Sequence, residues 1–503
     1  MVLEKALKTW FGYSTFRPGQ KEIIKEVLTG RDVLAVLPTG TGKSICYQLP
    51  ALISKGLTLV VSPLLSLMED QVQELKSTGI KSVAAINSFT EKRERDEVMS
   101  RLQEYNLIYT SPEMLQSPYF QQKLKKCSVS LFVIDEAHCL SQWGHDFRTD
   151  YLRLAEVRQA LDSPPCLAIT ATATEEVQHD ILRIMNMKAR TFLYSVDRSN
   201  LCLSVESFEN LHDKLKRLKS LIKTLKGNGM VYFSSRAWTE STALMLQNEG
   251  IEGVSYYHGG MTTEDRLLIQ QQFMSGQLQL ICCTSAFGMG INKKDIRYVI
   301  HFHYPLQLES YVQEIGRAGR DGENSLAVLL YCKEDQKLAK ALSTGELLSD
   351  EQIRVLLTEL STSDYLSIEK ERHLSELTGC SENAWQTLRY QLESRGVLQS
   401  NKIRPFSLES LSKDVKYEQD LRALDRQKKL YTFEAWIHSA TCKREKLLAY
   451  FSEELKSKPV ACCHVCGFNI QKYQDDLPAQ TKDIRSWEEM LATIFLQYER
   501  NET

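Results

Sequence analysis

The sequence predicts an α/β protein in which two domains with parallel sheets follow one another and precede a mostly helical region. Short apolar runs between 33 and 170 alternate with helical patterns, and turn-forming or polar residues end each run. The same alternation returns between 229 and 331, and helical periodicity replaces it beyond 345. Such runs are typical of parallel strands that are buried on both faces. The expected strands are 33–37, 57–62, 107–110, 131–136 and 166–170 in the first domain, and 229–233, 254–258, 278–284, 298–303 and 325–331 in the second.

Composition narrows the class of protein. The chain has 503 residues, of which 43% are hydrophobic and 25% are charged, so disordered, collagen-like and disulfide-scaffold proteins are excluded. Lys plus Arg total 62 and Asp plus Glu total 64, so any nucleic acid would have to be bound by local basic patches. No apolar run of about 18 residues predicts a membrane span. The cysteines are mostly single and scattered, which predicts free thiols in a reducing cytoplasm.

The first motif is a glycine-rich turn at 37–44, LPTGTGKS, which we call the phosphate-binding turn. A strand, a turn of this kind and a helix place backbone N–H groups around a phosphate. Lys43 would bring charge to the outer phosphates, and the Ser44 hydroxyl would bind Mg²⁺. Leu37 stands where the strict motif has glycine, and the alternative is a chance Gly-Lys-Ser in a loop. The expected nucleotide-binding residues of the turn are Thr39, Gly40, Thr41, Gly42, Lys43 and Ser44.

The second motif, VIDEAH at 133–138, is an apolar strand that ends in two carboxylates. Transfer of a phosphoryl group to water needs one acid to hold Mg²⁺ and another to position the attacking water. We assign the first role to Asp135 and the second to Glu136. An Asp-Glu pair alone is common on protein surfaces, but this one follows the phosphate-binding turn within one α/β unit.

The third motif is QEIGRAGRDG at 313–322, which we call the arginine motif. A triphosphate that is being hydrolysed needs positive charge on its γ-phosphate in the transition state. Arg320 is the candidate for this role, and Arg317 would assist it. The alternative is a pair of solvated arginines in a loop.

These motifs belong to a longer series that runs in a characteristic order. The series resembles the RecQ family of superfamily 2 DNA helicases, in a short, bacterial RecS-like form that is expected to lack the C-terminal winged-helix and HRDC domains. The resemblance implies two RecA-like domains, ATP with Mg²⁺, 3′-to-5′ movement on DNA, work in repair and recombination, and a cytoplasmic location at the bacterial nucleoid. The segments that carry it are TFRPGQ, PTGTGKS, SPLLSLMEDQV, TSPE, DEAHCLSQWGHDFR, TATAT, YHGGM, AFGMGIN and QEIGRAGRDG.

The resemblance also implies roles for single residues. In the adenine motif FGYSTFRPGQ, Gln20 would read the adenine edge, Tyr13 would stack on the base and Arg17 would reach the phosphates. His138 would couple the nucleotide state to the facing domain. Residues that match motifs for domain coupling, or for contact with nucleotide and DNA backbone, are Thr170, Thr172, Gly288 and Gly290.

Aromatic side chains recur at helical spacing directly after the acid pair, in CLSQWGHDFRTDY at 139–151. Single-stranded nucleic acid binds where rings stack on bases and a cation meets phosphate. Such a stripe is more often part of a core, but its position beside the acid pair favours DNA contact, and RecQ enzymes carry an aromatic-rich loop here. The candidate DNA-binding residues are Trp143, His145, Phe147 and Arg148.

Cysteines cluster near the C-terminus, in CKREKLLAYFSEELKSKPVACCHVCGF at 442–468. Four thiols that close a helical hairpin suit a structural, tetrahedral Zn²⁺ site. The second half reads CCxxC where the family usually has CxxCxxC, so His464 could replace one ligand, and free thiols are the alternative. The expected zinc ligands are Cys442, Cys462, Cys463 and Cys466.

A stretch that is long for the family separates the arginine motif from these cysteines. Its helix, turn, helix and terminal VLQSNKIRPF predict an inserted winged-helix-like module, in which Arg389, Arg395 and Lys402 could contact duplex DNA. A purely structural helical insert is the alternative. The expected domains are 1–200 and 201–345 for the two helicase domains, 346–410 for the module, 411–475 for the zinc region and 476–503 for a docking helix.

The motifs together predict an ATP-dependent DNA helicase that acts on single-stranded and forked DNA, with single-strand-binding protein or other repair proteins as candidate partners. One competing function is that of an RNA helicase or of a DNA-stimulated translocase with little duplex unwinding. Another is that of a non-catalytic scaffold, and the intact acid pair and arginine motif argue against it.

Overall fold

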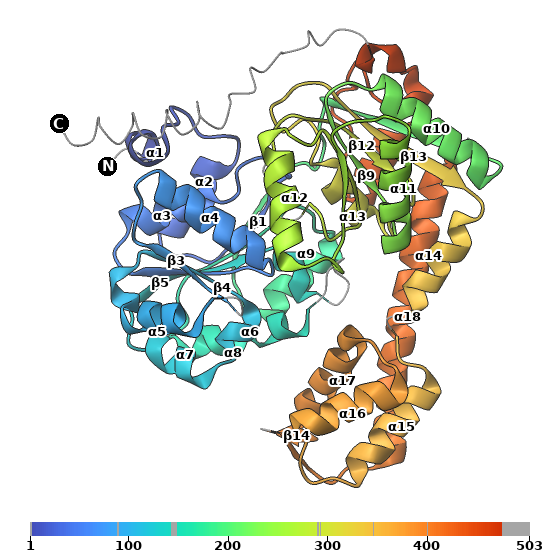
Figure 1. The fold of residues 1–503 in the computed structure, drawn as a ribbon. Coiled ribbons are helices and arrows are strands. Elements are labelled where there is room, and N and C mark those ends of the chain that lie inside the picture. The colour runs from blue at the N-terminus through green and yellow to red at the C-terminus, as the bar shows by residue number, and fades with distance from the viewer. Residues whose placement is uncertain are drawn as a thin grey trace.

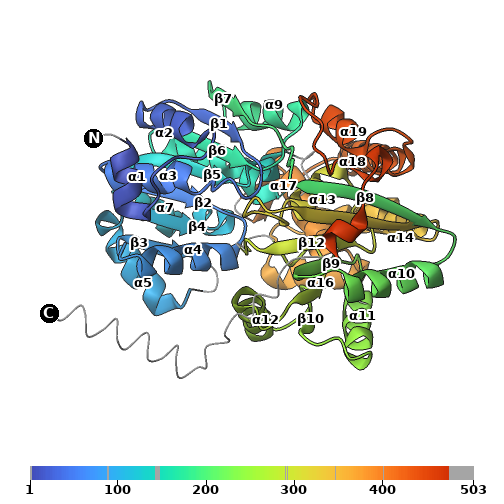
Figure 2. The same cartoon turned by 90° about the horizontal axis from the view of Figure 1, so that it is seen from above.

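The computed structural model describes residues 3–87, 90–141, 148–288, 291, 293–345, 347–399 and 401–474, without the side chain of Ser66. Figure 1 shows two α/β domains side by side and a smaller helical module, which the long helix α18 (Leu408–His438) joins to the second domain. Seen from above in Figure 2, α19 (Lys443–Tyr450) lies near β8 (Leu201–Phe208) of the second domain. Among the described helices, none is both long and apolar enough to cross a lipid bilayer.

The first domain is built on a sheet that has seven strands within the described residues, in the order β3-β4-β2-β5-β6-β1-β7, and its neighbouring strands pair in parallel. Its central strands are continuous apolar runs and are buried because helices cover both faces. The strands are β1 (Val33–Val36), β2 (Leu57–Val61), β3 (Val83–Ile86), β4 (Leu107–Thr110), β5 (Val129–Asp135), β6 (Cys166–Thr170) and β7 (Arg190–Leu193). The helices are α1 (Leu3–Phe11), α2 (Gln20–Leu28), α3 (Ile45–Ile53), α4 (Leu65–Ser77), α5 (Lys92–Ser100), η1 (Leu102–Glu104), α6 (Pro112–Leu115), α7 (Pro118–Leu124), η2 (Ala137–Leu140), η3 (Thr149–Arg153), α8 (Leu154–Ala160) and α9 (Glu175–Ile184).

The second domain repeats this plan. As far as the structure describes the chain, its sheet has six parallel strands in the order β10-β11-β9-β12-β13-β8. The strands are β8 (Leu201–Phe208), β9 (Asn228–Tyr232), β10 (Val254–Tyr257), β11 (Leu280–Cys283), β12 (Ile296–His301) and β13 (Ser325–Cys332). The helices are α10 (Leu211–Thr224), α11 (Arg236–Asn248), α12 (Thr263–Ser275), α13 (Leu308–Ile315) and α14 (Asp335–Thr344).

The strands expected from the sequence are all present, with small differences at their ends. β3, β7 and β8 were not expected. Because parallel pairing aligns the strand ends, the phosphate-binding turn after β1 and the acid pair at the end of β5 lie on the same edge of the first sheet.

The module has its own core, which is built from Trp385 and leucines of α15 (Asp350–Ser361), α16 (Ile368–Thr378) and α17 (Glu382–Ser394). Ser381 caps α17 by accepting a hydrogen bond from the Ala384 N–H, as its sequence context predicts. A short antiparallel pair follows, β14 (Leu398–Gln399) with β15 (Lys402–Ile403). Helices followed by a hairpin agree with the expected winged-helix-like order.

Helix α18 belongs to two cores at once. Near its start, Leu411 and Val415 pack in the core of the module, and near its end Phe433 and Trp436 pack in a core of the second domain. A continuous helix buried at both ends is a stiff connection. The module is therefore held to the second domain, and beyond α19 the chain continues as η4 (His464–Cys466) and η5 (Ile470–Tyr473). The expected docking helix at 476–503 lies outside the described residues.

Candidate active site

The phosphate-binding turn has the backbone that its glycines predict. Gly40 and Gly42 have φ values of 83° and 73°, a left-handed conformation that other L-residues rarely adopt. The Ser44 side chain makes no cap hydrogen bond to α3, so helix formation does not use its hydroxyl. The Lys43 Nζ is buried and has no hydrogen-bond partner within the described residues. A buried ammonium in this state fits a site that takes an anion.

The acid pair lies against this lysine. A distance of 3.5 Å separates the Lys43 Nζ from Oε1 of Glu136, whose own backbone is left-handed with a φ of 49°. Asp135 is buried, and burial together with the negative charge of Glu136 raises the pKa of its carboxyl to about 7. A buried carboxylate and an unused hydroxyl are oxygen ligands of the kind that Mg²⁺ binds, so Asp135 and Ser44 fit this ion.

A series of close polar contacts leads from Glu136 through His138 to the TATAT segment. The His138 Nδ1 lies 3.4 Å from Oε2 of Glu136 and 2.8 Å from Oγ1 of Thr170. The Thr170 hydroxyl in turn donates to the Thr172 carbonyl at 3.2 Å. The structure thus brings together the residues that the resemblance links to domain coupling.

The adenine motif braces the phosphate-binding turn. The Gln20 Nε2 donates to the carbonyls of Thr41 and Gly42 at 2.9 Å each, and its Oε1 accepts the Arg17 N–H at 2.9 Å. The Arg17 guanidinium donates to the Gly40 carbonyl. The Tyr13 side chain is 53% exposed. Recognition of adenine by Gln20 and Tyr13 remains a prediction.

The arginine motif meets the phosphate-binding turn across the boundary between the domains. A Cβ placed on Gly40 would lie 3.0 Å from Cγ of Arg320, and one placed on Gly316 would overlap the Thr39 hydroxyl. Burial and the nearby guanidinium of Arg317 lower the pKa of Arg320 to about 9. Two arginines close enough to repel one another, with Arg320 against the phosphate-binding turn, fit a site that takes an anion.

Arg317 is tied to the segment AFGMGIN of the same domain, because its Nη1 donates to the Gly288 carbonyl. Gly290 of this segment lies outside the described residues. Gly288 has a φ of 131°, and a Cβ there would lie 2.5 Å from Nε of Arg317, so this glycine allows the close approach of the arginine.

Most of the expected DNA-binding loop cannot be placed, because Trp143, His145 and Phe147 lie outside the described residues. At the end of the loop, the Arg148 Nη1 donates to the Pro63 carbonyl at 3.0 Å. Tyr151 is fully buried, and its hydroxyl donates to the Asp135 carbonyl at 3.2 Å. Tyr151 is therefore a core residue, and it anchors the end of the loop to the strand that carries the acid pair.

Four cysteine sulfurs come together beside β8. The Sγ atoms lie within 4.8 Å of one another, with 3.5 Å between Cys442 and Cys462, 3.5 Å between Cys463 and Cys466, and 3.9 Å between Cys442 and Cys463. Sulfurs around a tetrahedral zinc lie about 3.8 Å apart because each Zn–S bond is about 2.3 Å long. A disulfide would bring two sulfurs to about 2.05 Å. The cluster thus has the dimensions of a zinc site.

His464 stands next to this cluster and makes a different contact. Its Nδ1 accepts the Val205 N–H of β8 at 3.1 Å. The four cysteines therefore suffice as ligands, and His464 helps to attach the cluster to the second sheet.

The surroundings of the module arginines differ from what the sequence suggested. Arg389 forms ion pairs with Glu371 and Glu393, and Arg395 forms one with Glu418. Glu371 and Glu418 lie on the other helices α16 and α18, whereas Glu393 lies one turn along α17 on the same face as Arg389. Carboxylates of the protein therefore partly neutralise both guanidiniums, and contact of these two arginines with duplex DNA stays a prediction.

Two residues that were not selected as site residues from the sequence also reach the site. Arg198, in the segment assigned to the domain boundary, donates to the Thr39 carbonyl at 3.2 Å. Arg444, in α19, contacts the backbone of this segment. No local motif marks Arg198, and Arg444 could be noticed only as part of the CKRE context of the cysteines.

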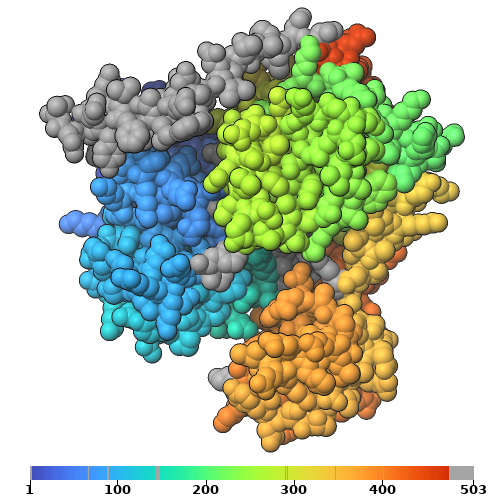
Figure 3. Space-filling model, in the orientation of Figure 1, coloured from blue at the N-terminus to red at the C-terminus, as the bar shows by residue number. Residues whose placement is uncertain are grey.

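A large groove adjoins the end of the aromatic loop. It has a volume of about 1090 Å³ and is lined by both helicase domains, the module and α18, with Arg148, Ser234, His303, Gln386 and Arg426 among the lining residues. Figure 3 shows the module (orange) below the helicase domains, and Arg153 of the first domain forms an ion pair with Glu393 of the module. The groove is large enough for a strand of nucleic acid, although acidic side chains are mixed with the basic ones.

Comparisons with known proteins agree with this site. The DEAD/DEAH box helicase family matches residues 17–180, and the helicase conserved C-terminal domain family matches residues 213–322. The chain is 40% identical over 497 residues to the probable ATP-dependent DNA helicase RecS of Bacillus subtilis (strain 168), with 98% of each chain covered. It is 43% identical to the ATP-dependent DNA helicase RecQ of Haemophilus influenzae, over 65% of this chain and 52% of that protein. Among solved structures, the DEAD-box helicase Mss116 bound to ssRNA and UDP-BeF matches with a TM-score of 0.57 and 20% identity, over 84% of this chain and 90% of that one, which supports the fold. The chain belongs to the RecQ family of superfamily 2 ATP-dependent DNA helicases.

Proposed function

We propose that this protein couples ATP hydrolysis to 3′-to-5′ movement on single-stranded DNA and to duplex unwinding, in DNA repair and recombination. The observation that carries the proposal is the meeting of the phosphate-binding turn with the arginine motif, where Arg320 lies against Gly40 across the domain boundary. A nucleotide bound there touches both domains, so its hydrolysis changes how the domains fit together.

Each charged residue has a role in this proposal. Lys43 binds the outer phosphates of ATP, and Glu136 orients the attacking water and accepts its proton. Arg320, assisted by Arg317, stabilises the charge that develops on the γ-phosphate. Bound Mg²⁺, held by Ser44 and Asp135, would neutralise phosphate charge.

DNA would bind at the aromatic loop and along the adjacent groove. Tyr151 anchors the end of the loop to the strand of the acid pair, so a base stacked on the loop can alter the position of Asp135 and Glu136. This connection supports ATP hydrolysis that is stimulated by DNA. The four cysteines would hold a structural Zn²⁺, because four protein ligands leave no open position for catalysis.

The choice between DNA and RNA can be tested with the purified full chain. ATPase rates are compared in the presence of single-stranded DNA and of RNA of the same length and sequence. We expect DNA to stimulate hydrolysis more strongly. Stronger stimulation by RNA would favour the RNA helicase, and no hydrolysis with either would favour the scaffold.

Replacement of Trp143 by alanine tests the proposed loop. Stacking contributes about 1–3 kcal/mol per base, so the DNA concentration for half-maximal ATPase stimulation should rise by about 5- to 150-fold. Tyr119 on α7 provides a matched control, because it is an exposed aromatic (52%) on the same domain, and Tyr119→Ala should leave this concentration unchanged. Equal behaviour of the two variants would remove the loop from the DNA-binding surface.

A further inference from the structure

Residues 194–200, called the linker here, carry the chain from β7 in the first sheet to β8 in the second. The phosphate-binding turn, the arginine motif and α19 all meet at the linker, around a cavity of about 30 Å³ lined in part by Thr39, Arg198, Gly316 and Arg444. We propose that Arg198 and Arg444 are positioning residues for ATP hydrolysis, with Arg444 holding the linker and Arg198 setting the approach of the arginine motif to the phosphate-binding turn. This inference deepens the proposed function and rests on it.

Arg198 joins the two domains through backbone carbonyls. Its Nη1 donates to Thr39 in the phosphate-binding turn at 3.2 Å and to Gly316 in the arginine motif at 3.3 Å. Its Nη2 donates to Ala318 at 3.3 Å and to Gly319 at 2.5 Å. A planar guanidinium offers N–H groups that diverge toward several acceptors, whereas the donors of a lysine share one nitrogen. The bridge therefore needs an arginine.

A second linker residue, Asn200, binds the backbone on both sides of Arg320. The Asn200 Nδ2 donates to the carbonyls of Gly319 and Glu323 at 2.9 and 2.8 Å. Arg320 lies between these two positions, so the linker fixes the backbone on both sides of the arginine that faces Gly40. A shift of the linker would therefore move Arg320 relative to the bound phosphates.

Arg444 fixes the linker from the other side. Its side chain is 3% exposed, and its Nη1 donates to the Asp197 carboxylate and, at 2.9 Å, to the Arg198 carbonyl. Its Nη2 donates to the carbonyls of Leu201 and, at 3.4 Å, Cys462. One buried guanidinium thus connects the linker, the start of β8 and the cysteine cluster.

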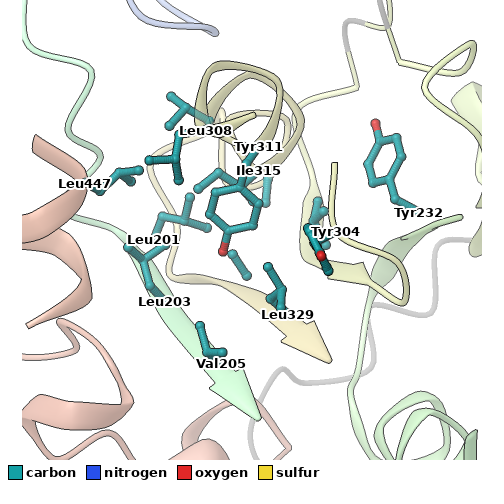
Figure 4. Packing of buried hydrophobic residues seen from close by; sticks show 14 of the residues in the cluster. Leu201, Leu203, Val205, Tyr232, Tyr304, Leu308, Tyr311, Ile315, Leu329 and Leu447 are labelled. Atoms are coloured by element: carbon teal, nitrogen blue, oxygen red, sulfur yellow. The ribbon is translucent and has the colours of Figure 1, made fainter. Parts of the chain in front are cut away.

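Two other contacts strengthen this attachment. The Glu453 carboxylate accepts the Val196 N–H of the linker at 3.1 Å. Figure 4 shows Leu447 of α19 beside Leu201 and Leu203 of β8, and these side chains belong to one buried cluster. Since the linker is held by buried polar contacts and by this apolar packing, it follows the position of α19.

The separate roles of the site residues predict whether nucleotide binding or kcat depends on the linker. The phosphate-binding turn and Lys43 belong to the first domain, so nucleotide binding should survive a displaced linker. The charge of Arg320 is needed most in the transition state, so its misplacement should lower kcat. A residue that only stabilises the fold would instead lower nucleotide affinity and melting temperature together.

The test uses the full chain with Arg198→Met, Arg444→Met and the exposed control Arg183→Met. DNA-stimulated kcat, the Kd for mant-ADP and the melting temperature are measured for each. We expect kcat to fall about 100-fold for Arg198→Met and about 10-fold for Arg444→Met, because small misplacements of a catalytic group have effects of this size. The Kd should stay within about twofold of wild type, and Arg183→Met should match wild type in every measurement.

Two more variants separate positioning from charge and from folding. Arg198→Lys keeps the charge but cannot bridge both domains, so its kcat should stay low, and a wild-type kcat would overturn the proposal. If both arginines act through one linker, the double variant should be no slower than Arg198→Met alone, whereas multiplied losses would contradict the shared route. If the variants lose nucleotide affinity and melting temperature together, both residues serve only to stabilise the fold. Absence of ATPase in the wild type would instead refute the proposed function.

Discussion

Replacement of Glu136 by glutamine is expected to lower kcat for ATP hydrolysis by about 100-fold or more, with ATP still bound. General-base catalysis contributes about 10²- to 10⁴-fold, and glutamine keeps the size of the side chain but cannot accept the proton of the attacking water. The Glu136 carboxylate lies 3.5 Å from Lys43 and 3.4 Å from His138, contacts that an amide can occupy without a large rearrangement. The measurement is single-turnover ATP hydrolysis together with equilibrium nucleotide binding.

A matched control is available in the same domain. Glu175 is an exposed acid in the first turn of α9, and Glu175→Gln removes the same charge from a side chain to which we assign no part in catalysis. This variant should hydrolyse ATP at the wild-type rate. Wild-type turnover by Glu136→Gln would show that another group activates the water.

Replacement of Cys442 by serine is expected to remove zinc and to lower the melting temperature by about 5 °C or more. Metal binding and folding are linked, because the four ligands come together only in the folded chain. Cys442 is the N-cap residue of α19 and is buried in the same cluster as Leu447 and Phe433, so its loss disturbs the attachment of α19 to the second domain. Metal analysis of wild type should give about one Zn²⁺ per chain.

Cys380 serves as the control for this substitution. It is half-buried in the module and lies outside the cysteine cluster, so Cys380→Ser should retain its zinc. If wild type purifies without metal, or if Cys442→Ser keeps both its zinc and its melting temperature, the cluster is not a structural zinc site.

The chemistry of the nucleotide site could be predicted from the sequence because it is local. The phosphate-binding turn and the acid pair each follow a continuous apolar strand, and parallel pairing brings strand ends to one edge. Strands β3 and β7 were missed for identifiable reasons. VAAI in β3 is rich in alanine, which has a low strand propensity, and RTFL in β7 is an exposed edge.

Contacts between distant segments could not be predicted in the same way. Arg198 and Arg444 lie 246 residues apart, and no spacing rule connects them. The ion pairs of the module arginines could not be predicted either, because Glu371 and Glu418, which face Arg389 and Arg395, lie on other helices. Charge in a helical sequence predicts a binding surface only when the acidic neighbours are also known.

ATP-dependent unwinding is tested most directly by strand displacement on matched duplexes with a 3′ or a 5′ single-stranded tail. With ATP and Mg²⁺, wild type should displace the strand of the 3′-tailed DNA, and Glu136→Gln should fail to do so. The 5′-tailed duplex should remain paired. A wild-type protein that hydrolyses ATP in the presence of DNA but leaves the 3′-tailed duplex intact would contradict the helicase function and favour a translocase.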